Sequence, residues 1–475
     1  MVMSKIKQPI TLLVVCIPFF GIFAQKLTLK KGIIIDSLKV RESLPETYAL
    51  YLPKDFELKE RWPLLAVFSM EGNGKNEVTK FITMAERFGY VIAGSNAIHD
   101  SLSLSENLLR TKAMLDHVVN SLPINRSRTY TAGFTDGGRF ANLVPILLKN
   151  VAGTLSINAA IVNVALLNGK KPFQFIGIAD KTNFNYPILL KDEKILNNFK
   201  FPNSILSDNW SPEALSDRML QAFSYFELLS MSKGSVPKDT VFINDRFQSD
   251  VAYIDELLKA KRYIEAYNAM GETIEAFRVL KNVDTLREQQ RNLKRNKSFR
   301  TQKREEDAAF FKEALLREDF ALYLEEDVLT YNYNNLGWWN YQKNQLNRYM
   351  KGDNSAEQKM GHRLIGYLNA LIDDNIDLVN NQKVIDEEAL VFLYMLKTII
   401  IPDNFENYFT VASIASKNED YGTALFYLEE AIKNGLKSAK RLYKIPHTAL
   451  LRITPEFNAL VEKYFKEARY KVNDR

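Results

Sequence analysis

The sequence predicts an α/β domain built on a mostly parallel sheet, followed by an all-α domain of helical repeats. Three observations lead to this fold class. Strand-like and helix-like segments alternate between residues 32 and about 232, which is typical of βαβ units. Strand patterns fade from about residue 250, where helical spacing of Leu, Tyr, Lys, Arg and Glu takes over. Finally, residues 405–436 form one helical-repeat unit.

The composition is that of a globular protein. The chain has 475 residues, enough for two or three domains, and 46% of them are hydrophobic while 25% are charged. The net charge of +6 is modest for this length, whereas nucleic-acid modules carry a stronger and clustered basic excess. We therefore expect no nucleic-acid partner.

The first 24 residues resemble a secretory signal peptide. Lys5 and Lys7 form a positive start, residues 10–23 are apolar, and Ala24 offers a small residue before the cut. The sequence therefore predicts an exported protein, periplasmic or extracellular, that is soluble and has no transmembrane span after cleavage.

Two alternatives concern the same segment. A membrane anchor needs about 20 apolar residues, and this run is shorter and contains Pro18. A lipoprotein signal would use Cys16, but bulky Val15 stands where a small residue is expected. Cys16 is the only cysteine, so the processed chain would have no disulfide and no cysteine-bound metal.

Within the α/β part, each strand is expected from a short apolar run bounded by turn residues. The first two runs are expected to form an antiparallel pair. The predicted strands lie within residues 31–40, 46–53, 62–70, 90–96, 127–134, 155–161, 173–180 and 201–207.

The helices between these strands show apolar residues at three- and four-residue intervals. Ser103 or Ser105 is expected to cap the second helix, and Ser211 with Pro212 suits the start of the last one. The predicted helices lie within residues 76–89, 103–122, 136–148, 186–199 and 211–231.

The junction at Gly133-Phe134-Thr135-Asp136-Gly137 has the spacing of a G-x-S-x-G nucleophile elbow, with Thr in place of Ser. A strand that runs directly into a helix here forces a tight turn. The glycines leave room for the backbone, and the central residue is pushed out above the sheet edge. Thr135 is therefore the candidate nucleophile position.

These segments resemble the α/β-hydrolase superfamily, most closely its esterase, polyhydroxybutyrate-depolymerase and dienelactone-hydrolase branch. The resemblance covers roughly residues 40–232. It rests on "RTYTAGFTDGGRFA" for the elbow, "FIGIADKTNFNYP" for the acid loop and "SILSDNWSPEAL" for the histidine loop. It implies a Ser-His-Asp type of ester hydrolysis, against which the residues of this chain can be compared.

The catalytic residues depart from that pattern. Thr135 occupies the nucleophile position and Asp180 the acid position. The stretch around Trp210 keeps the register of the histidine loop, but the histidine position falls on Asp208. An aspartate, with an ordinary pKa near ~3.9, is a weak base for a hydroxyl. His99, which follows a predicted strand, is the one substitute base to consider.

The oxyanion side is altered as well. The backbone amides of Gly72 and Asp136 are the candidate donors, but Glu71 brings a carboxylate to the place where negative charge would develop. Glu71, His99 and Trp210 are candidates for residues that line the pocket. The sequence predicts no metal site and no cofactor.

The second half is expected to be helical. Residues 405–436 resemble a tetratricopeptide repeat, with small Ala412 and Ala424 where the paired helices approach each other. Residues 287–304 are strongly basic and suggest either a solvated helix or linker, or a patch for an acidic partner. We predict a signal peptide at 1–24, an α/β-hydrolase-like domain at 25–235, a helical connector at 236–304 and a tetratricopeptide-like domain at 305–475.

The sequence thus favours an exported, catalytically inactive hydrolase-like protein that acts by binding. Its partner is expected to be a peptide or protein held by the helical domain, or a small molecule held above the sheet. The alternatives are an atypical carboxylic-ester hydrolase that uses Thr135 as nucleophile, and a carbohydrate- or lipid-binding pocket without a protein partner.

Overall fold

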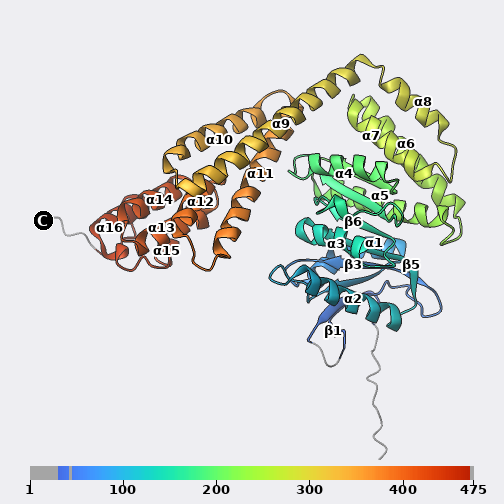
Figure 1. The fold of residues 1–475 in the computed structure, drawn as a ribbon, viewed down its shortest axis with the longest axis horizontal. Coiled ribbons are helices and arrows are strands. Elements are labelled where there is room, and N and C mark those ends of the chain that lie inside the picture. Colours follow the sequence, from blue (N-terminus) through green and yellow to red (C-terminus); the bar gives the residue numbers. More distant parts are fainter. Residues whose placement is uncertain (1–29, 42–44, 471–475) are drawn as a thin grey trace, which may run out of the picture.

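The computed structural model describes residues 30–41 and 45–470 (Figure 1), so the predicted signal peptide lies outside the described residues. Eight strands form a single sheet in the order β1-β2-β4-β3-β5-β6-β7-β8. Strand β2 is antiparallel to β1 and β4, and the other neighbours are parallel. The strands are β1 Ile34–Lys39, β2 Thr47–Tyr51, β3 Trp62–Phe68, β4 Val91–Ser95, β5 Ile124–Phe134, β6 Gly153–Ile157, β7 Gln174–Asp180 and β8 Asn203–Asp208.

Helices cover both faces of this sheet because its strands are apolar on both sides. Successive residues of β3 show the alternation: Leu64 joins the core on one face and Leu65 the core on the other. Helices α1 and α5 pack on the Leu65 face, and α2, α3 and α4 pack on the opposite one. Their bounds are α1 Gly74–Phe88, α2 Leu104–Ser121, α3 Thr135–Leu147, α4 Tyr186–Asn198 and α5 Pro212–Ser232.

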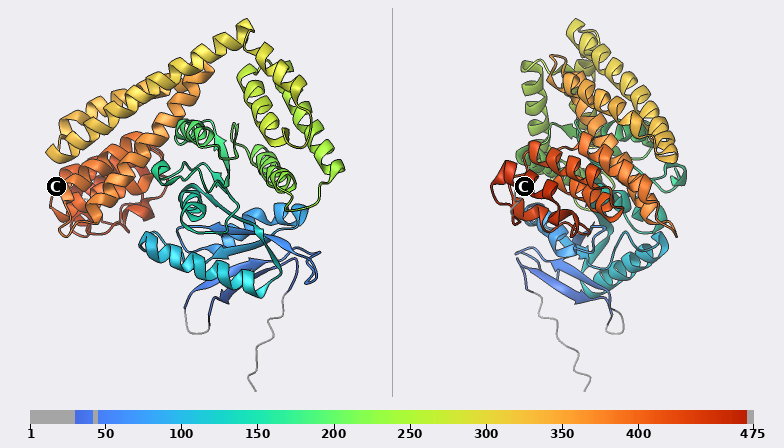
Figure 2. Two further views of the ribbon diagram at one scale, coloured as in Figure 1. Left: turned by 45° about the vertical axis from the view of Figure 1, so that its right-hand side comes forward. Right: turned by 90° about the vertical axis from the view of Figure 1, so that its left-hand side faces the viewer.

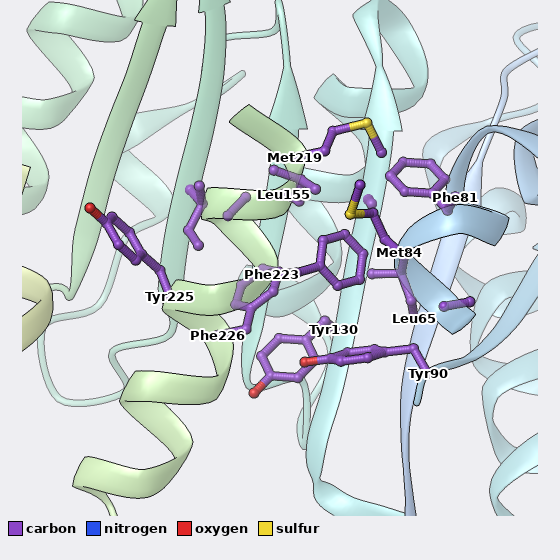
Figure 3. Close-up of a cluster of buried hydrophobic side chains, with 14 of the residues drawn as sticks. Leu65, Phe81, Met84, Tyr90, Tyr130, Leu155, Met219, Phe223, Tyr225 and Phe226 are labelled. Carbon is purple, nitrogen blue, oxygen red and sulfur yellow. The ribbon is translucent and has the colours of Figure 1, made fainter. Parts of the chain in front are cut away.

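The core on the α1 and α5 side is rich in aromatic rings (Figure 3). The rings of Tyr130 and Phe226 have centroids 4.2 Å apart, and Phe223 meets Tyr90 edge-on at 5.1 Å. The tyrosine hydroxyls find polar partners at the edge of this core: Tyr130 shares a hydrogen bond with Ser230, and Tyr90 donates to Glu227. This packing fixes α5, which follows the β8 loop, against the sheet.

The predicted helix starts are also present. Ser103 caps α2 in a reciprocal capping box with Glu106, and Ser211 caps α5 with Pro212 at its first position. The predicted α/β architecture, with its antiparallel opening pair, is confirmed.

From Asp208 onward, the described residues form helices and loops. The first group, α6 to α8, leads from the sheet to the long helix α9 (Figures 1 and 2). Helices α9, α10 and α13 pack on α11 or α12, and α14 packs on α13 and α16. These helices are α6 Thr240–Lys259, α7 Tyr263–Phe277, α8 Asp284–Leu293, α9 Lys297–Thr330, α10 Leu336–Lys351, α11 Ser355–Asn380, α12 Glu387–Ile400, α13 Phe405–Lys417, α14 Tyr421–Lys433, α15 Ala439–Leu442 and α16 Pro455–Phe465. Within the described residues, no helix is both long and apolar enough to cross a bilayer.

Two sequence expectations for this half can be compared with the helices. The pair predicted within residues 405–436 is formed by α13 and α14, with Ala412 and Ala424 buried between them. The basic stretch at 287–304 is helical, in α8 and the start of α9. Helix α9 continues through residues 304 and 305, so the boundary predicted there falls inside a helix.

The helical half docks on the loop that follows β7. Arg363 of α11 donates to the carbonyl of Lys181 at 2.8 Å, and Arg317 of α9 donates to the carbonyl of Phe184 at 2.7 Å. Both guanidinium groups are held by the buried carboxylate of Glu313. The side chain of Lys181 is itself buried and pairs with Glu265 of α7 at 3.0 Å. The carboxyl ends of β7 and β8 therefore face protein from the second half of the chain.

Candidate functional site

The turn between β5 and α3 has the geometry of a nucleophile elbow. Thr135 starts α3 directly after the last residue of β5, with φ of 46°. This left-handed conformation is strained for a β-branched residue. A Cβ on Gly133 would lie 2.3 Å from the carbonyl carbon of Gly137, and one on Gly137 would lie 2.1 Å from the carbonyl oxygen of Phe68. Both glycines are therefore required for the close approach of strand and helix.

A cavity of about 650 Å³ opens above this turn. It lies at the carboxyl ends of β3 and β5, where open α/β sheets bind ligands. The elbow, the loop after β3, α1, and the loop and first turns of α2 form its walls. The polar and charged lining residues are Ser69, Glu71, Asn76, Glu77, Lys80, Asp100, Asn107, Thr135, Asp136 and Arg139.

Glu77 of α1 gives the cavity a buried negative charge. The residue is only 5% exposed. Its Oε1 accepts from Lys80 Nζ at 2.6 Å, while its Oε2 is buried and has no hydrogen-bond partner among the described residues. Lys80 also lies over the ring of Phe134 at 4.7 Å from the centroid. A buried carboxylate oxygen without a donor is costly, so Glu77 is suited to receive a donor from a bound molecule.

The charges around the cavity are predominantly acidic. Glu71, Asp100 and Asp136 add three carboxylates to that of Glu77, against two cations, Lys80 and Arg139. Arg139 lies 3.8 Å from Asp136 at the surface. An anionic ligand would therefore meet net repulsion, and a cationic one net attraction.

The predicted oxyanion donors differ in their surroundings. Asp136 is the second residue of α3, so its backbone N–H has no acceptor within the helix and points from the helix start. Gly72 has φ of 67°, and a Cβ there would lie 3.0 Å from the carbonyl oxygen of Asn96, so the β3 loop packs tightly at this glycine. The N–H of Glu71 is engaged by the Ser69 hydroxyl at 3.2 Å, and its exposed side chain lines the cavity.

Asp180 and Asp208 are the last residues of two neighbouring strands and lie opposite each other in the parallel ladder. The carboxylate of Asp180 is used locally, because it accepts from the N–H of Thr182 at 2.9 Å and from its hydroxyl at 2.8 Å. The N–H of Asp180 donates to Asn158 at 2.8 Å. These bonds hold the acid within its own turn.

Asp208, at the predicted histidine position, is bound by groups from α5 and from the helices beyond it. Arg218 of α5 lies 3.0 Å away, and Arg262 just before α7 lies 3.5 Å away. Tyr253 of α6 donates to the same carboxylate at 3.5 Å. Burial opposes ionisation of Asp208, but the charge and hydrogen bond of Arg218 prevail and lower the pKa of the carboxyl below its usual value. This group is held as an anion and is unsuited to accept a proton from a hydroxyl.

His99 and Trp210 are not among the residues that line the cavity. The Nδ1 atom of His99 is 2.9 Å from the hydroxyl of Ser101 and 2.7 Å from the carboxylate of Asp100, and the ring is half exposed. Its backbone forms an isolated bridge with Glu71. Trp210 is 43% exposed beside the β8 loop. Among the described lining residues of the cavity, there is neither an imidazole nor an indole.

The structure thus brings Thr135, Asp136 and Glu71 together in one cavity, with Gly72 in the adjoining loop. It adds Glu77 and Lys80, which the sequence analysis missed. A signal was present, because Glu77 stands beside Val78 on the apolar side of an amphipathic helix, where a charge is unusual. No group of three or more His, Cys, Asp or Glu residues suited to a metal ion occurs among residues 30–41 and 45–470.

Comparisons with solved structures give similarity to hydrolases over the first half of the chain. Esterase 2 from Thermogutta terrifontis, phosphorylated by paraoxon, is 9% identical, and the match covers 44% of this chain and 98% of that chain with a TM-score of 0.36. A dienelactone hydrolase-like promiscuous phosphotriesterase from metagenomic libraries is 10% identical, and the match covers 41% of this chain and 97% of that chain with a TM-score of 0.35. An S-formylglutathione hydrolase from Staphylococcus aureus is 12% identical, and the match covers 42% of this chain and 99% of that chain with a TM-score of 0.33.

No protein-family model and no curated protein matches the chain. The fold itself is read from the eight-stranded sheet, its parallel core and the strand–elbow–helix junction at Thr135. Together with the helices on both faces, these features make the first half an α/β-hydrolase fold, and the described residues after it are all-α.

Proposed function

We propose that this chain is a binding protein whose α/β-hydrolase fold has lost its ester-hydrolysing machinery. The observation that carries the proposal is Asp208, a carboxylate at the position of the missing base, held by Arg218 and Arg262. Because the members of a triad act as a unit, loss of the base removes most of the rate. Among the described residues that line the cavity with Thr135 there is no imidazole, the group that acts as base in a Ser-His-Asp triad.

The cavity above Thr135 is proposed to bind a small molecule that presents a cationic nitrogen. The buried Oε2 of Glu77 needs a donor, the surrounding charges are mainly acidic, and side chains such as Phe134, Phe140 and Leu104 offer apolar contact. A carbohydrate has only neutral hydroxyl donors. It could donate a hydrogen bond to Glu77, but it would gain nothing from the acidic charge of the cavity.

The helical half is proposed to be a tetratricopeptide-like domain that contacts a peptide or protein. The pair α13 and α14 supports this proposal because small residues pack between the helices, as in such repeats. A hollow of about 360 Å³ beside them is lined by Tyr333, Glu388 and Asp420 among others, which suits a basic segment. Export after removal of residues 1–24, and a first domain ending near residue 235, remain part of this proposal.

The ligand is tested by isothermal titration with phenethylamine and its neutral analogue 2-phenylethanol. We expect the amine to bind and the alcohol to bind at least about tenfold more weakly, because a charge-assisted hydrogen bond is worth about 1.5–3 kcal/mol. Glu77→Gln should remove the preference, whereas Glu60→Gln, at an exposed position of the same domain, should keep it. Equal binding of amine and alcohol to the unchanged chain would refute a cation site.

The alternative, an atypical ester hydrolase, is favoured by one feature, the strained backbone at Thr135. We expect p-nitrophenyl acetate and butyrate to be hydrolysed at the same background rate by the unchanged chain and by Thr135→Ala and Thr135→Ser. The serine variant restores the usual nucleophile but leaves the base position occupied by Asp208. Turnover that disappears in Thr135→Ala would establish the hydrolase and overturn the proposal.

A further inference from the structure

Helix α9 carries two apolar faces, and only one of them is covered. Phe299, Ala309, Phe320 and Leu324 are buried against other helices. On the opposite side, Phe311, Leu315, Leu322 and Leu329 are exposed to 69%, 48%, 61% and 73%. Single exposed apolar residues are ordinary, but these four form one line along a helix of 34 residues.

The spacing of this line is that of a helix–helix seam. Leu315, Leu322 and Leu329 are seven residues apart, and Phe311 precedes Leu315 by four. A seven-residue apolar repeat keeps one stripe facing a partner helix over several turns. Figure 2, left, shows α9 as the yellow-to-gold helix along the upper outer edge of the protein. The exposure of the four side chains leaves the stripe available to another molecule.

The charges on the same face change sign along the helix. Toward its start the exposed charges are mainly basic, with Lys297, Arg300 and Arg304 against Asp307, which pairs with Lys303. In its second half the exposed charges of this face are acidic, at Glu318, Glu325 and Glu326. Neither Arg304 nor Glu325 forms an ion pair with another described residue. The face is therefore complementary to itself when a second copy is turned end to end.

We propose that this face of α9 is a dimer interface, in which α9 of one copy packs antiparallel against α9 of a second copy. Leu315 lies midway between Arg304 and Glu325–Glu326, so an axis near Leu315 places each basic end against the partner's acidic end. The two-fold arrangement uses one patch twice and closes on itself. A parallel pair would place like charges together, and an unrelated partner would not need this internal complementarity.

The interface is tested by sedimentation of the full-length chain over a range of concentrations. The unchanged chain is expected to pass reversibly from monomer to dimer. Leu315→Glu should raise the dimer dissociation constant by more than about tenfold, because Leu315 lies at the proposed axis and the change places two carboxylates against each other in the apolar stripe. Leu58→Glu is the matched control, since Leu58 is also 69% exposed but lies in a loop of the first domain; it should leave the constant unchanged.

A charge exchange tests the orientation. Arg304→Glu alone should weaken the dimer, and Arg304→Glu with Glu325→Arg should restore it, because both contacts of the antiparallel pair are exchanged together. In a parallel pair, Arg304→Glu would instead relieve repulsion between two arginines and strengthen the dimer. A chain that stays monomeric, a dimer insensitive to Leu315→Glu, or a dimer strengthened by Arg304→Glu would each overturn the proposal.

Discussion

Replacing Glu313 by alanine is expected to lower the free energy of unfolding by about 3–5 kcal/mol, the cost of leaving a buried charge without its partner. Glu313 is 2% exposed, and its two oxygens hold Arg363 at 2.6 and 2.8 Å and Arg317 at 2.7 Å. Arg363 is itself 2% exposed. Its guanidinium would stay buried after the change, with no carboxylate in place.

The effect should reach the sheet, because the same two arginines donate to the carbonyls of Lys181 and Phe184 in the loop after β7. Urea unfolding followed by circular dichroism gives the apparent midpoint. Asp319→Ala, on the exposed side of the same helix, is the control and should change stability by less than about 0.5 kcal/mol. Equal midpoints for the two variants would contradict the assigned role of Glu313.

A double replacement separates loss of the ion pair from loss of packing. Glu313→Leu with Arg363→Met removes the carboxylate and the more deeply buried of its two arginines and keeps side-chain volume in place, while Arg317, whose side chain is 15% exposed, keeps its charge. Since buried ion pairs replaced by apolar residues are often neutral or more stable, the double variant should be more stable than Glu313→Ala. If it is equally unstable, the lost hydrogen bonds to the β7 loop rather than the uncompensated charge explain the effect.

The fold of the first half was predictable because its signals are local. Buried strands appear as continuous apolar runs, and the elbow needs Gly133 and Gly137 for steric reasons that a short segment reveals. The positions of Asp180 and Asp208 could be predicted from strand order alone, since the ends of adjacent parallel strands meet at one edge.

The partners of these residues could not be predicted in the same way. Arg262 is 54 residues from Asp208 in sequence, and Arg363 is 182 residues from Lys181. No periodicity links such pairs, because packing of the helical half alone brings them together. The sequence predicts that Asp208 occupies the histidine position, but it gives no sign of the arginines that hold this carboxylate.

The domain boundary predicted between residues 304 and 305 shows a second way in which the sequence alone is insufficient. The predicted connector ends at residue 304, and the sequence changes there from basic to acidic. A change of charge does not interrupt a helix, however, and the segment "TQKREEDAAFFKEALL" contains no Gly or Pro to end one. Helix α9 therefore continues, and its reversal of charge is a property of one surface.

Replacing Glu272 by glutamine is expected to stabilise the protein at neutral pH. Glu272 lies in α7, and burial raises the pKa of its carboxyl to about 8. The charge of Arg218 acts against this shift, and the carboxylates of Glu193 and Asp250 add to it. The group therefore keeps its proton in the folded chain at a pH where the unfolded chain releases it.

The sign follows from this difference. Below the ordinary value of 4.5 both states are protonated, and between 4.5 and about 8 stability falls as pH rises because only the unfolded state loses the proton. At pH 7 the penalty is about 3 kcal/mol, and glutamine, which is neutral and of the same shape, removes it. We expect Glu272→Gln to match the unchanged chain near pH 4.5 and to exceed its stability by about 3 kcal/mol at pH 7.

Urea titrations at several pH values measure this difference, with Glu275→Gln, an exposed position on the same helix, as the control. If Glu272→Gln were no more stable than the unchanged chain at pH 7, the carboxyl would have to be ionised there, with Arg218 as its counter-charge. Arg218 would then be shared between Glu272 and Asp208, and Asp208 would be held less firmly as an anion. The same titration therefore tests how strongly the carboxylate at the missing base position is held.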